Sequence, residues 1–346
     1  MRGRERSRTF ISTTFALTAL FLLACLLGGA WLAYRNTFRE TGSGPVGGPE
    51  PPVEQADVKP ANVVTPGSEA RLEPLVMRFV PEKAAQGGLV RAWAQWSEDG
   101  AASTGTPVAP PGPTLRLKAF NSEWPAYSSE HTISAFLAVP VSAKPGPHEV
   151  ILLDPSGDVL ARGSIVVERT PFSESRITVT KETESLTQDS ARIASDREKV
   201  RLARSSSPPN RLWTEPFIVP VKARVTTDFG HARFVNGVES GRHYGVDFGA
   251  AAGTPVLASN AGVVVLAEYL QLSGWTVIID HGQNLFTSYL HLSSTSVRPK
   301  DVVRRGDVIG KVGSTGFSTG PHLHWSATVG SSPFNPLQLL ISELFQ

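Results

Sequence analysis

Short apolar runs alternate with turn-forming residues between residues 75 and 170, and this pattern predicts strands separated by turns. The expected strands are 75–80, 89–96, 114–120, 133–139, 148–153 and 164–167. The segment from Asp154 to Asp158 is rich in turn residues and should join the last two strands. Six such strands favour a small β-sandwich of the immunoglobulin type, in which the Pro-rich stretch 100–113 forms a long loop.

The same alternation returns after residue 211. Strands are expected at 263–266, 275–280 and 285–290, and a hairpin is expected from 302 to 313, with a turn at Gly306 and Asp307. Only residues 336–345 have a helical pattern. The pattern therefore predicts a second, mainly antiparallel β domain over residues 211–346.

A more polar segment lies between the two β domains. Ser185 and Gln188 have the spacing of a capping box, which would begin a helix over residues 182–204. Leu186, Ile193 and Val200 are spaced by seven residues and form one thin apolar stripe. This spacing is typical of a helix that packs one face on a neighbour, and the predicted helix and linker cover residues 181–210.

The N-terminal region has a different pattern. Residues 9–34 contain no charged side chain, and several arginines precede them. A run of this length predicts a transmembrane anchor over residues 1–40 with a short cytoplasmic stub. A cleaved signal peptide and a lipoprotein processed at Cys25 are the alternatives. Residues 41–74 are rich in Gly and Pro and predict a disordered linker before the β domain of residues 75–180.

Composition narrows the possible chemistry. The chain has 346 residues, of which 40% are hydrophobic and 18% charged, and its formal net charge is +2. This near balance gives no reason to expect a nucleic-acid partner. The single cysteine, Cys25, excludes an intrachain disulfide, a cysteine-rich zinc module and a CxxC redox site. Any metal ligands must therefore be mainly His, Asp or Glu.

The C-terminal histidines have a spacing that suits a metal. His243 and Asp247 are four residues apart, and His322 and His324 are two apart. Residues at these separations share one face of a strand, so both pairs could point into one cleft. Two histidines and a carboxylate leave an open position on a tetrahedral zinc, which is the arrangement of a catalytic site. His291 is the best candidate for a further proton-transfer group.

Four motifs, taken together, resemble those of a known family. They are Thr227-Asp228-Phe229-Gly230, His243-x-Gly-Val-Asp247-Phe248, Tyr289-Leu290-His291-Leu292, and the Gly-rich run Gly313–Pro321 followed by His322-Leu323-His324. Their order and spacing over residues 216–338 are similar to those of the lysostaphin and LytM-type M23 zinc metallopeptidases. The upstream β-sandwich resembles the M23 N-terminal domain, which extends the similarity to residues 75–338.

The resemblance implies a fold and a set of site residues. It implies an antiparallel β groove with one zinc ion per chain, held by His243, Asp247 and His324. It makes His291 and His322 the two catalytic histidines. Asn236 stands near the position of an asparagine that occupies the zinc in latent family members, but a plain Asn-Gly turn is the preferred interpretation. His281 is interpreted as structural.

The resemblance also implies a function and a location. The expected protein is a zinc-dependent endopeptidase that hydrolyses peptide cross-links of bacterial peptidoglycan, with peptide stems as its substrate. It would be a single-pass protein of the inner membrane, with its C-terminal domains in the periplasm or outside the cell, where an envelope protein could be a partner. The alternatives are a non-catalytic LytM-type regulator and an envelope scaffold. A further hypothesis is that the helix at 182–204 covers the groove and inhibits.

Overall fold

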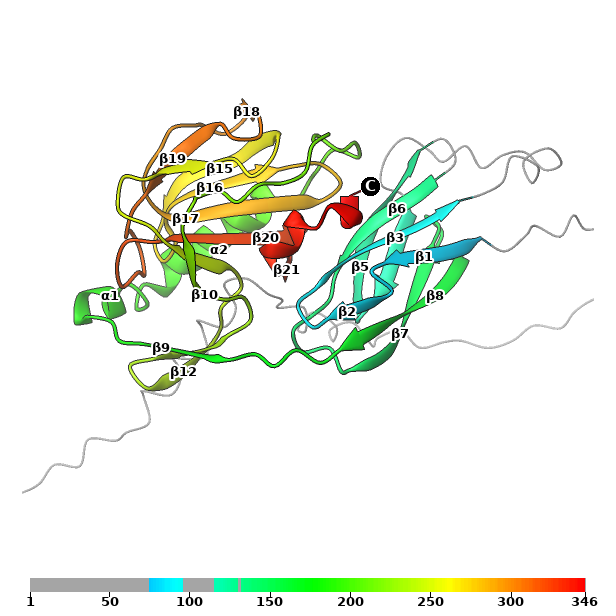
Figure 1. Ribbon diagram of the computed structural model, residues 1–346, viewed down its shortest axis with the longest axis horizontal. Helices are drawn as coiled ribbons and strands as arrows, with labels where there is room; N and C mark the ends of the chain where they lie inside the picture. Colours follow the sequence, from blue (N-terminus) through cyan, green and yellow to red (C-terminus); the bar gives the residue numbers. More distant parts are fainter. Residues whose placement is uncertain (1–74, 96–114, 130–131, 346) are drawn as a thin grey trace, which may run out of the picture. The chain divides into compact units, whose positions relative to one another are not determined.

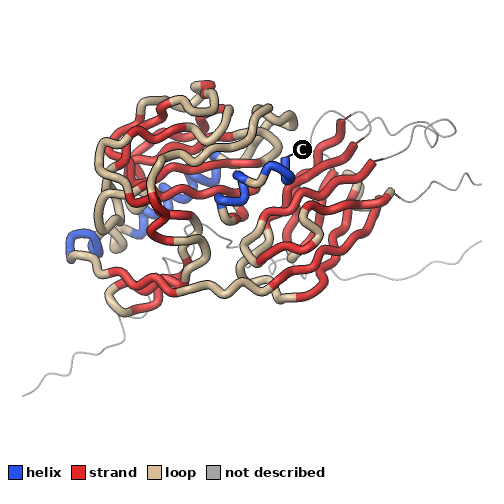
Figure 2. The backbone as a smooth tube through the Cα atoms, viewed as in Figure 1, coloured by secondary structure: helices blue, strands red, loops and turns tan. Residues whose placement is uncertain are grey.

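The computed structural model describes residues 75–95, 115–129 and 132–345 (Figure 1). The predicted anchor, the linker of residues 41–74 and the Pro-rich loop lie outside these residues. Within the described ranges, no helix combines the length and the apolar character that a membrane span requires. Strands dominate these ranges, as the red segments of Figure 2 show, so the predicted mainly β fold is confirmed.

The N-terminal domain is a sheet folded into two layers that share one strand. The strands follow the order β1-β3-β6-β5-β4-β7-β8-β2. Strand β5 pairs with β4 through residues 122–126 and with β6 through residues 127–129, so it passes from one layer into the other. The strands are β1 (Val76–Val80), β2 (Lys83–Ala85), β3 (Leu89–Gln95), β4 (Leu115–Ala119), β5 (Ser122–Ser129), β6 (Thr132–Ala138), β7 (Gly146–Leu153) and β8 (Val159–Glu168).

All six predicted strands of this domain are present, and two more were not predicted. Strand β5 carries Pro125 and several polar residues, and β2 has only three residues, so neither has an apolar run. The predicted turn between β7 and β8 is confirmed. There the carboxylate of Asp154 accepts hydrogen bonds from the backbone N–H groups of Gly157 and Asp158, both at 2.8 Å.

The C-terminal domain is built on a larger, mainly antiparallel sheet. Its main path is β10-β13-β20-β17-β16-β15-β18, and β14, β19 and β21 pair at its margins. The strands are β10 (Arg224–Thr227), β13 (Val246–Gly249), β14 (Pro255–Leu257), β15 (Gly262–Leu270), β16 (Gly274–Asp280), β17 (Leu285–Thr295), β18 (Val302–Val303), β19 (Val308–Val312), β20 (Leu323–Val329) and β21 (Ser332–Phe334). The three strands predicted between 263 and 290 are confirmed.

The hairpin predicted over residues 302–313 is wrong. Strand β18 pairs with β15, whereas β19 pairs with β14 and β17. The turn at Gly306 and Asp307 does form, but its backbone pairs with Ala258, since Gly306 N donates to Ala258 O and Ala258 N donates to Asp307 O, each at 2.9 Å. The turn is therefore held by a third segment, and the two strands lead away from each other.

The C-terminal helix predicted over residues 336–345 is a pair of 3₁₀ turns, η4 (Pro336–Leu340) and η5 (Ser342–Phe345). Ile341 between them has an extended backbone, which interrupts the helix. These turns contact the N-terminal domain: Gln338 Oε1 accepts a hydrogen bond from Leu89 N, and the Phe345 ring lies 5.6 Å from that of Phe136. The two β domains therefore share one continuous core.

The helical segment begins and ends differently from the prediction. Two helices, α1 (Lys181–Ser185) and α2 (Ser190–Ala203), replace the single helix expected over 182–204. The predicted capping box at Ser185 is wrong, because Thr180 caps α1 and Asp189 caps α2. The Asp189 carboxylate accepts a hydrogen bond from Arg192 N at 2.9 Å, which satisfies a free donor of the first turn.

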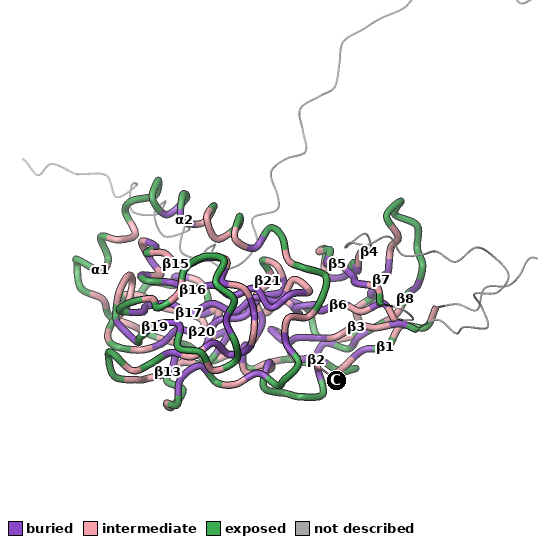
Figure 3. The backbone as a smooth tube through the Cα atoms, turned by 90° about the horizontal axis from the view of Figure 1, so that it is seen from above, coloured by how far each residue is buried: buried purple, intermediate pink, exposed green. Residues whose placement is uncertain are grey.

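Helix α2 packs on the sheet through Ile193 and Val200, two of the three residues of the predicted stripe, whereas Leu186 is the C-cap of α1. Ile193 is buried, and Val200 packs against a cluster formed by Leu266, Leu270, Ile278 and Phe286. Figure 3 shows α2 lying over β15 and β16. Because α2 covers this apolar cluster, removing the helix would expose four core side chains to water. The stripe is thus explained by core packing, and inhibition by this segment stays a prediction.

A small third sheet has the strand order β12-β11-β9. Strand β11 (Ala232–Val235) forms a hairpin with β12 (Val238–Arg242) and pairs in parallel with β9 (Glu174–Ile177). Strand β9 falls within the range predicted for the sandwich, yet it pairs with the C-terminal domain. This pairing holds the hairpin of β11 and β12, which leads directly to His243.

Candidate active site

Three side chains predicted as metal ligands meet at one point of the large sheet. Asp247 on β13 lies directly opposite His324 on β20 in the antiparallel register. His243 lies just before β13 and is held by the backbone bond from its N–H to His231 O, at 2.9 Å. Asp247 Oδ1, His243 Nε2 and His324 Nδ1 are each 2.9 Å from the other two. All three residues are buried.

The tautomer of His243 is set by its second ring nitrogen. His243 Nδ1 lies 2.9 Å from Asp228 O. Because a carbonyl only accepts hydrogen bonds, Nδ1 carries the proton, and the Nε2 lone pair of the neutral ring is directed at Asp247 and His324. A backbone carbonyl thus gives the ring the protonation state that a metal ligand needs.

Electrostatics favours an ionised Asp247 carboxylate at this point of the site. Burial by itself raises the pKa of Asp247, but the charges and hydrogen bonds of His243 and His324 outweigh it and bring that pKa well below its ordinary value. Burial lowers the pKa of His324 to about 4. At neutral pH Asp247 therefore offers an anionic oxygen and His324 an imidazole lone pair.

This donor set fits zinc. Tetrahedral zinc with N and O ligands at about 2.0–2.1 Å would separate the ligand atoms by about 3.3 Å, close to the triangle seen here. Among the described residues, no other group of three His, Cys, Asp or Glu side chains converges in this way. Three ligands leave a fourth position for water or substrate, as in catalytic zinc sites.

Glycine at position 245 allows His324 to reach this site. A Cβ at Gly245 would collide with His324 Nε2 and lie 2.8 Å from Trp325 O. The Gly in the motif His243-x-Gly-Val-Asp247 is therefore required by the close approach of β20 rather than by a turn.

His291 lies within β17 and directly follows Leu290, which is opposite His324 in the register of β17 against β20. Its backbone has φ +60°, a left-handed conformation that is uncommon for residues other than glycine. Two hydrogen bonds hold it there, from His291 N to Ser273 O and from His291 Nδ1 to Thr315 O, both at 2.9 Å. A strained backbone fixed in this way is often part of a functional site.

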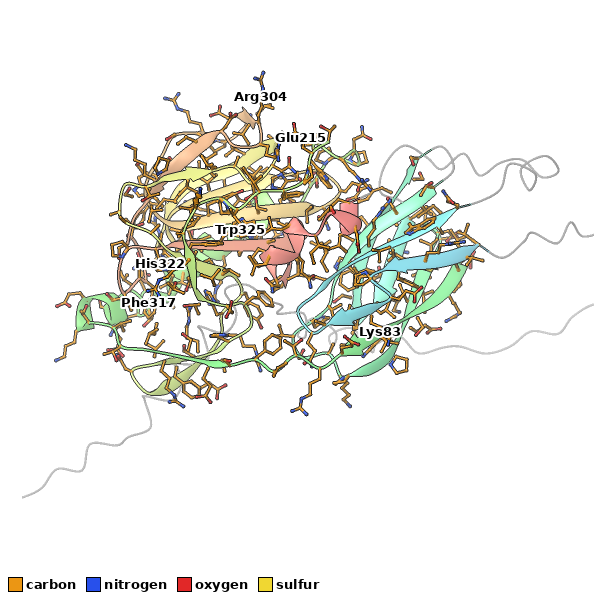
Figure 4. All side chains as sticks on the ribbon, in the orientation of Figure 1. Lys83, Glu215, Arg304, Phe317, His322 and Trp325 are labelled. Carbon is orange, nitrogen blue, oxygen red and sulfur yellow. The ribbon has the colours of Figure 1, made fainter. Side chains whose placement is uncertain are left out.

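His322 lies just before β20, beside the Gly-rich loop. Figure 4 shows it close to Phe317 of that loop, whereas Trp325 lies within the sheet. His322 Nδ1 donates to Gly320 O at 2.8 Å, and its Nε2 is 3.9 Å from Asp247 Oδ1. The His291 and His322 ring centroids are 4.9 Å apart. The structure therefore brings the two predicted catalytic histidines to the edge of the ligand cluster.

The two histidines have the same arrangement of protons. Each donates Nδ1–H to a backbone carbonyl, so in the neutral form of either ring Nε2 carries the lone pair. Burial, followed by the nearby charges of His322 and His324, lowers the pKa of His291 to about 3. A neutral imidazole with an unshared lone pair beside a metal site can accept a proton and then return it.

The predicted Gly-rich approach packs tightly under His291. Gly316 has φ +72°, and a Cβ there would collide with Gly274 N and lie 2.5 Å from Leu272 O. Thr315 Oγ1 donates to Leu292 O at 2.6 Å and accepts from Trp275 N at 3.0 Å. Glycine thus lets the loop touch the turn between β15 and β16, and this contact fixes Thr315 O beneath His291.

Two other residues lie away from this centre. Asn236 has φ +48° at the turn of the β11–β12 hairpin, and its Oδ1 accepts from Val179 N at 3.0 Å, in line with the Asn-Gly turn interpretation. His281 is fully buried, with Nδ1 donating to Ala261 O at 2.7 Å. Its Nε2 lies 2.8 Å from Thr287 Oγ1, whose other neighbour is Tyr289 Oη at 2.9 Å.

The burial of His281 predicts a pH dependence of stability. Burial lowers its pKa to about 4. In the unfolded chain the histidine binds a proton below about pH 6.5. Unfolding therefore takes up a proton between pH 6.5 and 4, and the free energy of unfolding decreases as the pH is lowered through that window. The contribution of His281 between pH 7 and 5 should be about 2 kcal/mol. Urea unfolding at both pH values measures it.

The matched variant for this measurement is His281→Gln, whose amide can still donate and accept but does not titrate. It should lower stability at pH 7 and reduce the difference between pH 7 and 5. An unchanged difference in this variant would show that His281 is not the group responsible.

Arg233 on β11 is a site residue that the sequence did not reveal. Its Nη2 lies 3.9 Å from Asp247 Oδ2. It is separated from Asp247 by a hairpin and belongs to none of the four motifs. No spacing rule connects it with Asp247, and only the pairing of β11 with β9 brings it there.

Comparison with known proteins agrees with this geometry. Residues 241–336 match the profile of Peptidase family M23. The chain is 44% identical over 99 residues to the DD-carboxypeptidase/endopeptidase Mpg of Neisseria meningitidis serogroup B, covering 29% of this chain and 23% of that protein. It is 44% identical over 96 residues to the peptidoglycan DD-endopeptidase ShyA of Vibrio cholerae serotype O1, covering 28% and 22%.

A solved structure extends the similarity beyond that domain. The crystal structure of a putative peptidase M23 from Pseudomonas aeruginosa is 25% identical, has a TM-score of 0.53, and covers 76% of this chain and 96% of that one. The chain spans less than a quarter of the length of the two curated relatives above. Residues 241–336 therefore form a domain of peptidase family M23.

Proposed function

We propose that this protein is a zinc-dependent endopeptidase that hydrolyses peptide cross-links of peptidoglycan. The observation that carries the proposal is the convergence of His243, Asp247 and His324 with the free Nε2 atoms of two further histidines. Relatives named as peptidoglycan DD-endopeptidases support the choice of substrate.

The chemistry follows from the donor set. Zinc, held by His243 Nε2, Asp247 Oδ1 and His324 Nδ1, would polarise the scissile carbonyl and lower the pKa of a bound water. His291 and His322 would accept a proton at Nε2 while their Nδ1–H groups stay bonded to Thr315 O and Gly320 O. Each resulting imidazolium can stabilise an oxyanion or pass its proton to the leaving amine.

The proposal also includes a location. The chain would be anchored in the inner membrane by residues 9–34, with the β domains in the periplasm or outside the cell. The uncharged run and the arginines before it support this topology.

Protease treatment of spheroplasts should degrade the β domains while intact cells protect them. The proposal also includes an envelope protein as a partner of the β domains.

Digestion of purified cross-linked muropeptides tests the activity directly. The protein should convert dimers into monomers detected by mass spectrometry, with one zinc per chain measured on the same sample. Dimers that stay intact despite stoichiometric zinc would instead favour a non-catalytic regulator or scaffold. Cleavage by protein that contains no metal would contradict the zinc mechanism.

A further inference from the structure

Arg233 is a largely buried cation beside the metal ligands, and its hydrogen-bond donors are unused. Only 23% of its side-chain surface is accessible. Its guanidinium makes no hydrogen bond with another described residue, and Nε is buried without a partner. By contrast, Arg242 of the same hairpin donates to Gly230 O at 2.8 Å.

The nearby carboxylate does not account for these donors. The separation of 3.9 Å between Arg233 Nη2 and Asp247 Oδ2 exceeds the usual 2.7–3.2 Å range of a hydrogen bond. Asp247 Oδ1, meanwhile, faces His243 and His324. The attraction between the charges of Arg233 and Asp247 helps to hold Arg233 at the site. The planar fork of N–H groups on Arg233 can still donate hydrogen bonds to another group.

A guanidinium with free donors is suited to a second carboxylate. Its fork can bind both oxygens of a carboxylate in a bidentate manner, which a lysine cannot reproduce. Leaving the buried Nε–H donor of Arg233 unsatisfied costs about 1–3 kcal/mol. A ligand that brings a carboxylate into this position would remove that cost.

The geometry of a peptide substrate places such a group within reach. In a peptide whose carbonyl is at the metal, the carboxyl carbon of the next residue lies three bonds from the scissile carbonyl carbon. We propose that Arg233 binds the free α-carboxylate of the residue that contributes the scissile nitrogen. This inference rests on the proposed function and specifies its substrate class.

Two kinds of cell-wall substrate carry this group. One is a cross-link through a diamino dicarboxylic acid, whose amide nitrogen lies on a carbon that bears a free carboxylate. The other is a stem peptide that ends in two D-amino acids. A pentaglycine bridge lacks the group, because the corresponding carboxyl is already part of the next peptide bond. Arg233 therefore selects direct cross-links over glycine bridges.

A matched pair of substrates tests this selection. One is a cross-linked dimer with the free carboxylate, and the other is the same dimer amidated at that carboxyl. The zinc-loaded full chain should cleave the free form with kcat/KM about 10- to 100-fold higher, mainly through a lower KM. Arg233→Gln should lose this preference and cleave the two dimers with similar kcat/KM.

The control variant is Arg176→Gln on the adjacent strand β9. Arg176 is exposed, pairs with Glu174 at 2.6 Å and stacks on Phe234. The Arg176→Gln substitution removes the same charge from the same small sheet and should keep the preference for the free carboxylate. Zinc content of each variant is measured in parallel. If Arg233→Gln loses zinc and both activities equally, Arg233 only positions Asp247 and the proposal is overturned.

A binding measurement separates this inference from the proposed activity. Titration of both dimers into His322→Ala protein, in which turnover is blocked, gives their Kd values directly. Arg233-dependent preference for the free carboxylate would support the inference even if the wild type cleaved neither dimer. Equal affinities for the two dimers would overturn the inference even if cleavage were efficient.

Discussion

His324→Ala should lose both bound zinc and peptidase activity. His324 supplies Nδ1 to the triangle of ligand atoms and pairs with Asp247 across β13 and β20. Without it, two ligands remain, which is too few for a stable catalytic zinc site. Because metal polarisation supplies several kcal/mol of transition-state stabilisation, activity should fall on the order of 10³-fold or more.

The measurement is zinc content by atomic spectroscopy together with muropeptide cleavage on the same preparation. His148→Ala is the matched control, because this histidine lies on β7 of the sandwich and its Nε2 bonds only Lys144 O among the described residues. The control should retain both properties. Full activity of His324→Ala without zinc would refute the proposed metal site.

His291→Ala and His322→Ala should each retain one zinc per chain while kcat falls by about 10²–10⁴-fold. Neither ring belongs to the ligand triangle, and each has a free Nε2 beside it. The double variant should lose little more than either single one if the two histidines act as a unit. Steady-state kinetics and zinc analysis of all three proteins check this.

Loss of zinc in either single variant would reassign that histidine as a ligand. A variant with normal zinc and normal kcat would remove the residue from the proton-transfer scheme. The conservative change His322→Gln keeps a hydrogen-bond donor for Gly320 O but not the basic Nε2, so it should resemble the alanine variant in kcat.

The hydrophobic pattern predicted strands well where one face is buried. The strands β7, β15 and β16 have clear apolar runs, and each was found near its expected bounds. The pattern failed at β5, which contains Pro125 and many polar residues, and which owes its place to pairing on both sides. It also failed for residues 302–313, because β18 pairs with β15 while β19 pairs with β14 and β17.

The sequence by itself determined the types of chemistry available. A single cysteine and clustered histidines left His and Asp as metal ligands, and the separations in His243-x-x-x-Asp247 and His322-x-His324 made a shared site plausible because strand residues alternate between faces. The apolar stripe of a helix and the apolar runs of strands are likewise local patterns that can be recognised along the chain.

Only the tertiary structure decided how these groups are used. The register of β13 against β20 sets Asp247 opposite His324, and carbonyls from other segments fix the protons of His243 and His291. The parallel pairing of β9 with β11 brings Arg233 to the site. These contacts join residues far apart in the sequence, where no local periodicity carries information, so they appear only when the backbone hydrogen bonds are in place.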